Sequence, residues 1–112
     1  MSIGEELKID TFKQVVIFLI DNETYAVSIE DVKEVVKTPQ ITTVPDSPKY
    51  ILGVINLRGK IVPVLDLEKR FDLHRENKII SEHVMILEAD QKNFIGVQVD
   101  KVTEVLKIPE NL

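Results

Sequence analysis

Two stretches of this chain repeat one another, and a repeat limits the folds that the chain can adopt. Residues 15–26 align with residues 84–95, and residues 27–40 align with residues 97–110 once Gly96 is treated as an insertion in the second copy. Nine of the 26 aligned pairs are identical. Four of these are Val–Val pairs in a Val-rich chain, but the Asp, Glu, Lys and Pro matches also keep their order. The pattern indicates an internal duplication; the alternative is two unrelated hairpins of similar composition.

The apolar residues of both copies are mostly β-branched. Val and Ile total 29, against ten Leu, and β-branched side chains fit a pleated strand better than a helix. The longest apolar run, residues 15–20, has six residues, far fewer than the about 20 that a membrane-spanning helix needs. The chain is therefore predicted to be all-β. Strands or extended segments are expected over residues 14–21, 25–29, 41–44, 54–57, 61–65, 84–89 and 94–99.

Turn and helix signals separate these strands. Residues 21–24 predict a turn because Asp and Asn tolerate left-handed backbone, and Gly59 predicts a tight turn within the hairpin at residues 54–65. Ser28 is a candidate N-cap, and the three valines within residues 32–36 have helical spacing. These signals predict a short helix that ends near Lys37. A second, single helical turn is expected over residues 66–71.

The two copies differ in the length of chain that comes after them. Copy one continues past Gln40 through the hairpin at residues 54–65, whereas copy two reaches Glu110, the counterpart of Gln40, near the last residue given, Leu112. We expect a first barrel unit over residues 12–73, a connector over 74–82 and a partial second unit over 83–112. An unfinished barrel leaves strand edges and apolar surface in water. Three outcomes stay open: a fragment of a longer chain, strands supplied by another chain, or a loosely folded second copy.

Composition argues against several functional classes. The chain has no Cys, which excludes a disulfide framework, a Cys-ligated metal and a Cys nucleophile. Its two His, His74 and His83, lie in a polar segment and read as surface residues, so no metal or other cofactor is expected. No phosphate-binding, dinucleotide-binding or serine-hydrolase motif is present, and no catalytic set is predicted. An SH3-like or OB-like nucleic-acid module is disfavoured by the formal net charge of −5 and few aromatic residues.

Arg58 is the most informative charged residue. It lies at the tip of an otherwise apolar hairpin, and a tight turn would hold its guanidinium as a fixed fork suited to a carboxylate of a partner. The alternative is an ordinary solubilising charge on a turn. The valines at positions 32, 35 and 36 are equally open to two interpretations, core packing or a contact surface.

The hairpin sequence resembles a known family. Residues 53–67, GVINLRGKIVPVLDL, resemble the signature stretch of the CheW family of chemotaxis coupling proteins. The strand that contains Tyr25, the Glu34-Val35 pair and the ITTVP segment at residues 41–45 are also similar, so the resemblance covers about residues 12–110. The regulatory domain of the kinase CheA and the protein CheV share this fold, and a domain cut from such a protein is an alternative. A short free-standing chain is most similar to CheW itself.

The resemblance implies a fold and a function. The fold would be two tandem, five-stranded SH3-like barrels with one or two short helices, the second barrel incomplete here. The function would be a non-enzymatic cytoplasmic adaptor, associated with membrane receptor arrays, which couples the cytoplasmic tips of chemoreceptors to the regulatory domain of CheA. A strand-exchanged homodimer is predicted if the chain ends at Leu112. The positions that match contact positions of the family are Val32, Glu34, Gly53, Asn56, Arg58, Val102 and Val105.

Overall fold

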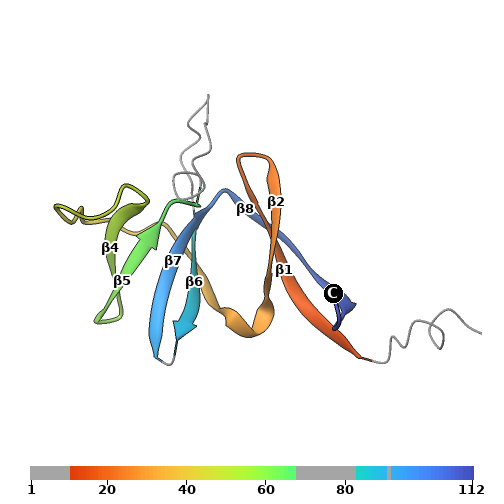
Figure 1. Ribbon diagram of the computed structural model, residues 1–112. Coiled ribbons are helices and arrows are strands. Elements are labelled where there is room, and N and C mark those ends of the chain that lie inside the picture. Colours follow the sequence, from red (N-terminus) through yellow and green to blue (C-terminus); the bar gives the residue numbers. More distant parts are fainter. Residues whose placement is uncertain (1–10, 68–82, 91) are drawn as a thin grey trace, which may run out of the picture.

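The described part of the chain forms eight strands in two sheets, and each sheet contains strands of both sequence repeats. A computed structural model describes residues 11–67, 83–90 and 92–112 (Figure 1). The strands are β1 (Phe12–Ile20), β2 (Glu23–Ser28), β3 (Val32–Lys37), β4 (Ile51–Leu57), β5 (Lys60–Leu65), β6 (His83–Asp90), β7 (Asn93–Val99) and β8 (Lys101–Pro109). One sheet has the order β2-β1-β8 and the other the order β3-β6-β7-β5-β4. The predicted all-β class is confirmed.

The predicted helix from Ser28 to Lys37 is wrong. Only a 3-10 turn, Ile29–Asp31, follows the Ser28 cap, and the valines after it belong to strand β3. Val35 is 38% exposed whereas Val36 packs against buried residues, an alternation of period two that a helix cannot have. The helical turn expected over residues 66–71, the connector and His74 lie wholly or mostly outside the described residues.

The turns expected from local sequence are confirmed. Asp21 and Asn22 both have positive φ, 51° and 64°, at the turn between β1 and β2. Arg58 and Gly59, with φ of 50° and 86°, form the two-residue loop between Leu57 and Lys60. Two successive residues with positive φ match the right-handed twist of the flanking strands, so these short loops set the register of their hairpins.

The repeats are interlocked by reciprocal strand pairing. The third strand of copy one, β3, pairs with the first strand of copy two, β6, and β8 of copy two pairs with β1 of copy one. Val35 lies opposite Met85 and its counterpart Val105 lies opposite Val16. Both ladders also carry a register shift at the same repeat position, between Val32 and Glu34 and between Ile17 and Phe18. The two ladders therefore share the same register and the same irregularity, which supports the duplication.

Gly96, the insertion in copy two, reverses the face of the residues before it. Copy one has no residue that corresponds to Gly96. There, Tyr25 lies opposite Phe18, and the two rings stack with their centres 5.7 Å apart. Phe94, the sequence counterpart of Tyr25, lies opposite Glu88 instead and packs with the other side of the sheet. A one-residue change of register moves a strand's side chains to the opposite face. Matching Tyr25 with Phe94 in sequence therefore does not match them in space.

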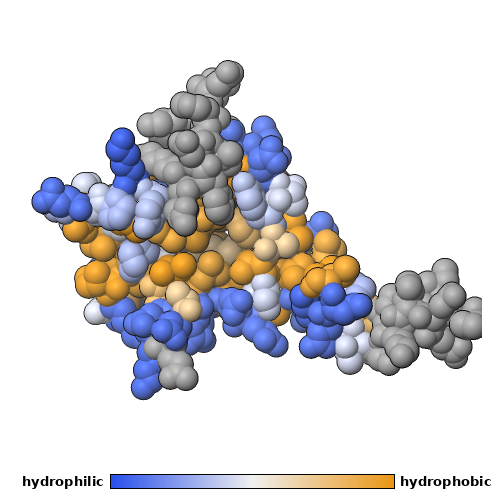
Figure 2. All heavy atoms as spheres, viewed as in Figure 1, coloured by the Kyte–Doolittle hydropathy of each residue, from blue (hydrophilic) through white to orange (hydrophobic). Residues whose placement is uncertain are grey.

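Two apolar clusters follow from this arrangement. The inter-sheet core joins β1 to β6 and β7 and consists of Val16, Phe18, Ile20, Met85, Val97 and Val99. The barrel core lies within the five-stranded sheet and consists of Ile55, Val62, Val64, Val84 and Ile86. Strand β1 contributes to both sides of its sheet, as its unbroken apolar run predicts. Figure 2 shows the apolar residues as a band between hydrophilic turns.

The sheets combine strands from both expected units. Strands β3 to β5, within residues 12–73, join β6 and β7 of the second unit in one sheet, while β1 and β2 join β8 in the other. The expected unit bounds therefore describe repeats of sequence, and each sheet takes strands from both repeats. Among the described residues, the three-stranded sheet has no hairpin that corresponds to β4 and β5.

Candidate protein-binding site

Arg58 is held in a defined orientation by its turn. Its positive φ belongs to the two-residue loop, and the loop is fastened by Asn56, whose side-chain Oδ1 accepts a hydrogen bond from the Gly59 N–H at 2.8 Å. Asn is suited to this role because its short amide side chain can bond to nearby backbone. Asn56, predicted as a contact residue, therefore has a structural role as the brace of the turn.

Arg58 pairs with Glu34, a residue 24 positions earlier in the chain. The guanidinium donates to both carboxylate oxygens: Nη1 lies 3.4 Å from Oε2, and Nη2 makes a shorter contact with Oε1. The hydrogen bond and the charge of Glu34 raise the pKa of Arg58. Because Glu34 lies on β3 and Arg58 follows β4, the pair connects the two end strands of the five-stranded sheet. This side-chain contact links the two ends of the sheet, and a backbone bridge between Thr42 and Val54 also joins the segment after β3 to β4.

The pair leaves the arginine accessible. The Arg58 side chain is 72% exposed and that of Glu34 is 29% exposed. A guanidinium has five N–H donors, and the Glu34 contacts use only two of its nitrogens. The Arg58 guanidinium is thus oriented by the Glu34 carboxylate, while part of the guanidinium faces solvent.

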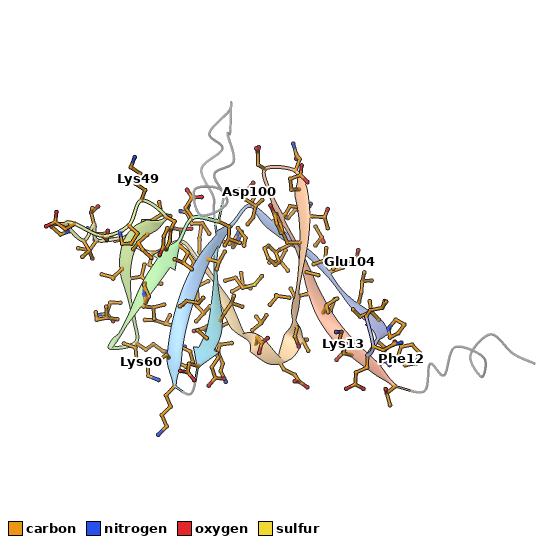
Figure 3. All side chains as sticks on the ribbon, in the orientation of Figure 1. Phe12, Lys13, Lys49, Lys60, Asp100 and Glu104 are labelled. Atoms are coloured by element: carbon orange, nitrogen blue, oxygen red, sulfur yellow. The ribbon has the colours of Figure 1, made fainter. Side chains whose placement is uncertain are left out.

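A hollow of about 380 Å³ lies beside this ion pair. Its apolar wall comes from Leu57, Ile86 and Phe94. Lys33 and Lys60 lie at its rim: Lys33 pairs with Glu88 at 3.1 Å, and the Lys60 ammonium lies 4.5 Å from the centre of the Phe94 ring. Figure 3 labels Lys60 at the start of β5, beside the turn. An apolar wall with a fixed charged rim is typical of a surface that binds protein.

Gly53 is required by the fold of the hairpin. A Cβ at this position would lie 2.3 Å from the carbonyl oxygen of Thr42, and its φ is +152°. Thr42 and Val54 exchange two backbone hydrogen bonds of 2.8 Å here, which ties the segment before β4 to the hairpin. The packing of Gly53 therefore accounts for glycine at a position predicted as a contact.

The three valines predicted as contact positions on β3 and β8 fall into two groups. Val32 and Val102, which are repeat counterparts, are partly buried against the inter-sheet core. Val105 and its repeat counterpart Val35 are both exposed, by 48% and 38% respectively. Directly opposed residues of antiparallel strands share a face, so these two valines lie on the same faces as Val16 and Met85 of the inter-sheet core. Val35 and Val105 thus form its exposed margins.

The structure brings together only part of the predicted set. One end of the barrel, here called its mouth, is the end with the β4–β5 turn, and it brings together Arg58, Glu34 and Asn56. By contrast, Val102 and Val105 lie on β8 in the other sheet. Sequence reasoning missed Lys60 and Phe94 at the mouth. The signal that could have found Phe94 is the Gly96 insertion, because an added residue turns the preceding side chains toward the barrel. Within the described ranges, no group of three His, Asp or Glu could hold a metal ion.

Comparisons with known proteins agree with this geometry. The sequence profile of the CheW-like domain matches residues 14–112. The chain is 36% identical over 104 residues to "Chemotaxis protein CheW" of Bacillus subtilis, which covers 93% of this chain and 66% of that protein. It is 33% identical over 93 residues to the protein of the same name from Helicobacter pylori, which covers 83% of this chain and 56% of that protein. The chain thus spans less than two thirds of these relatives.

A solved structure is similar over most of the fold. The scaffolding protein TtCheW of Thermoanaerobacter tengcongensis superimposes with a TM-score of 0.81 and is 44% identical. The match covers 90% of this chain and 68% of that one. The similarity therefore includes both sheets and the hairpin that carries Arg58.

Proposed function

This chain belongs to the CheW-like domain family, and on that premise we propose that it is a non-enzymatic adaptor that couples chemoreceptors to the histidine kinase CheA. The observation that carries the proposal is the family match over residues 14–112, which includes the whole mouth of the barrel. The similar solved structure is that of a scaffolding protein, which supports the same role. The partners would be the cytoplasmic tips of the receptors and the regulatory domain of the kinase.

The adaptor would act through contacts that differ between conformations of its partners. Arg58, oriented by Glu34, supplies directional hydrogen bonds at the mouth of the barrel. Val105 and the partly buried Val32 and Val102 supply apolar area near the inter-sheet core. Charged groups set the register and choice of a partner, whereas apolar area supplies most of the affinity. An adaptor of this kind transmits the bias of a receptor by holding the kinase in one geometry.

The proposed place of action is the cytoplasmic side of receptor arrays, reached through these partners. In the part of the chain that the structure describes, no helix is long and apolar enough to cross a membrane. Membrane association would then come from the receptors, and detergent-free extraction of cells lacking receptors should release the protein.

The test is binding of the chain to a purified receptor cytoplasmic fragment and to the CheA regulatory domain, measured by biolayer interferometry. Arg58→Glu should weaken at least one of the two interactions by about tenfold or more, as loss of an interfacial arginine often does. Lys49→Glu, an exposed charge reversal in the segment before β4, should leave both unchanged. Wild-type binding to neither partner would refute the adaptor role.

A charge swap separates two roles of Arg58. In the double variant Arg58→Glu, Glu34→Arg the intramolecular pair can form again with its charges exchanged. Binding that stays weak in the double variant means that the partner contacts the guanidinium itself. Restored binding means that the pair acts by closing the barrel mouth, and Arg58 is then a positioning residue.

A further inference from the structure

Strands β5 and β7 diverge, and the space between them forms a slit. They run parallel but pair only at Val64 with Gly96 and at Leu65 with Val97. If this register continued toward the first residues of both strands, Ile61 would pair with Asn93, but no ladder forms there. The resulting slit, about 550 Å³ in volume, is lined by residues 60–63 and 92–95.

Pro63 and Gly96 explain where the strands separate. Pro63 has no N–H to give to a ladder, and the pairing with β7 begins at the next residue, Val64. On the other strand, a Cβ at Gly96 would lie 2.8 Å from the Val84 side chain and 3.4 Å from that of Val64. Glycine therefore allows the close approach at one end, and proline removes a donor where the strands part.

The slit is apolar at its base and positively charged at its rim. Ile61 is 66% exposed, although it is a large β-branched residue in a strand. Pro63 and Ile95 are partly buried beside it. Of the residues that the structure describes, the only ionisable ones that line the slit are Lys60 and Lys92, and Lys60 is positioned by the Phe94 ring. Lys60 and Phe94 line both this slit and the hollow beside Arg58.

We propose that the slit between β5 and β7 binds an extended, acidic segment of a partner protein, with an apolar side chain seated on Ile61. Carboxylates on either side of that side chain would meet Lys60 and Lys92. Where no ladder with β7 forms, the backbone of Ile61 can pair with part of an extended peptide, although Pro63 adds no N–H donor. A nucleic acid is a poor fit, because the chain carries a net charge of −5 and this surface offers two cations.

The test uses two synthetic peptides, the acidic GEVEIEVG and its basic counterpart GKVKIKVG, titrated into the ¹⁵N-labelled chain. The acidic peptide should shift the backbone amide signals of residues 60–62 and 93–95, and the basic peptide should not. Higher salt should weaken the binding because both charge contacts lie near the surface. Equal shifts with both peptides, no shifts with either, or shifts confined to residues outside the slit would overturn the proposal.

Matched variants show whether the slit itself is responsible. Ile61→Asp should reduce affinity for the acidic peptide by about tenfold or more, and Lys92→Glu by about fivefold. Val44→Asp places the same charge on another exposed apolar residue, 39% exposed, and should have no effect. If Ile61→Asp perturbs folding, Ile61→Thr, which keeps the strand preference, should still lower the affinity. Arg58→Glu should keep peptide binding, so this proposal can fail independently of the adaptor role.

Discussion

At the scale of single residues, the family positions around the hairpin tip divide by task. Asn56 and Gly53 hold the backbone of the β4–β5 hairpin in place. Glu34 orients the side chain of Arg58, and Arg58 presents its guanidinium to solvent. Sequence alone located Arg58 and its turn, because positive φ at a two-residue loop follows from local chemistry. It did not pair Arg58 with Glu34, since that contact depends on how β3 and β4 meet across the barrel.

Gly53 offers the sharpest residue-scale prediction. Gly53→Ala should destabilise the chain by about 2–4 kcal/mol, because the new Cβ would collide with Thr42 backbone where φ is also positive. Gly59→Ala should cost only about 1 kcal/mol, since nothing lies within 4 Å of its Cβ and only the backbone conformation is strained. Urea unfolding measures both. Equal costs would mean that backbone conformation alone, and not the approach of Thr42, requires Gly53.

The Arg58 ion pair should be insensitive to pH near neutrality. Its pKa is raised by the hydrogen bond and charge of Glu34, so the contribution of the protonated arginine is complete below the unfolded pKa and is lost only as pH rises through the still higher folded value. The stability difference between wild type and Arg58→Met should therefore stay constant over about pH 6 to 9. Thermal unfolding at several pH values tests this. A difference that changes across that range would mean that another titrating group is coupled to Arg58.

At the scale of elements, the segment after Ser28 shows why a strand replaced the predicted helix. Its valines have helical spacing, but as a strand the segment can also pack its side chains on both faces. Val36 packs with the barrel core, and Val35, on the other face, lies opposite Met85. Pairing with β6 supplies backbone hydrogen bonds across the whole segment, and tertiary context routinely overrides such short local patterns. The sequence repeat pairs residues 32–37 with residues 102–107, and in the structure both segments are strands.

Two conservative substitutions test this alternation. Val36→Thr places a hydroxyl near the barrel core and should destabilise the chain by about 1–2 kcal/mol, whereas Val35→Thr should change stability by less than about 0.5 kcal/mol. A helix with both valines on one face would respond equally to the two changes. Urea unfolding free energies decide between these outcomes, and both variants keep β-branching, so strand preference is controlled.

At the scale of the whole molecule, two similar sheets differ in one hairpin: among the described residues, only the five-stranded sheet has one that covers its face. The β4–β5 hairpin covers Val84 and Ile86, which are fully buried. Their counterparts in the described part of the other sheet, Val15 and Ile17, are less well covered. The strand-exchanged dimer stays a prediction. Exchange would move one hairpin per chain to a partner without adding another, so it could not cover both sheets of either chain.

The exposed face of the three-stranded sheet should promote self-association. Leu106 is 40% exposed and lies opposite Val15, whereas its repeat counterpart Val36 packs with the barrel core. Leu106→Lys should therefore reduce concentration-dependent association, measured by sedimentation velocity. Val44→Lys, a change at a similarly exposed valine in the segment before β4, should not. A wild-type chain that stays monomeric at every concentration would contradict this expectation.

Reciprocal strand pairing also dictates an order of events during synthesis. Strand β1 leaves the ribosome early, but its partner β8 is made some ninety residues later, and β3 likewise waits for β6. Neither sheet can be completed before strands of the second repeat have been made, and contacts so distant in sequence form slowly. The nascent chain therefore carries the bare edge of β3 until β6 emerges, and that of β1 until β8 emerges. This is the interval in which a chaperone would matter most.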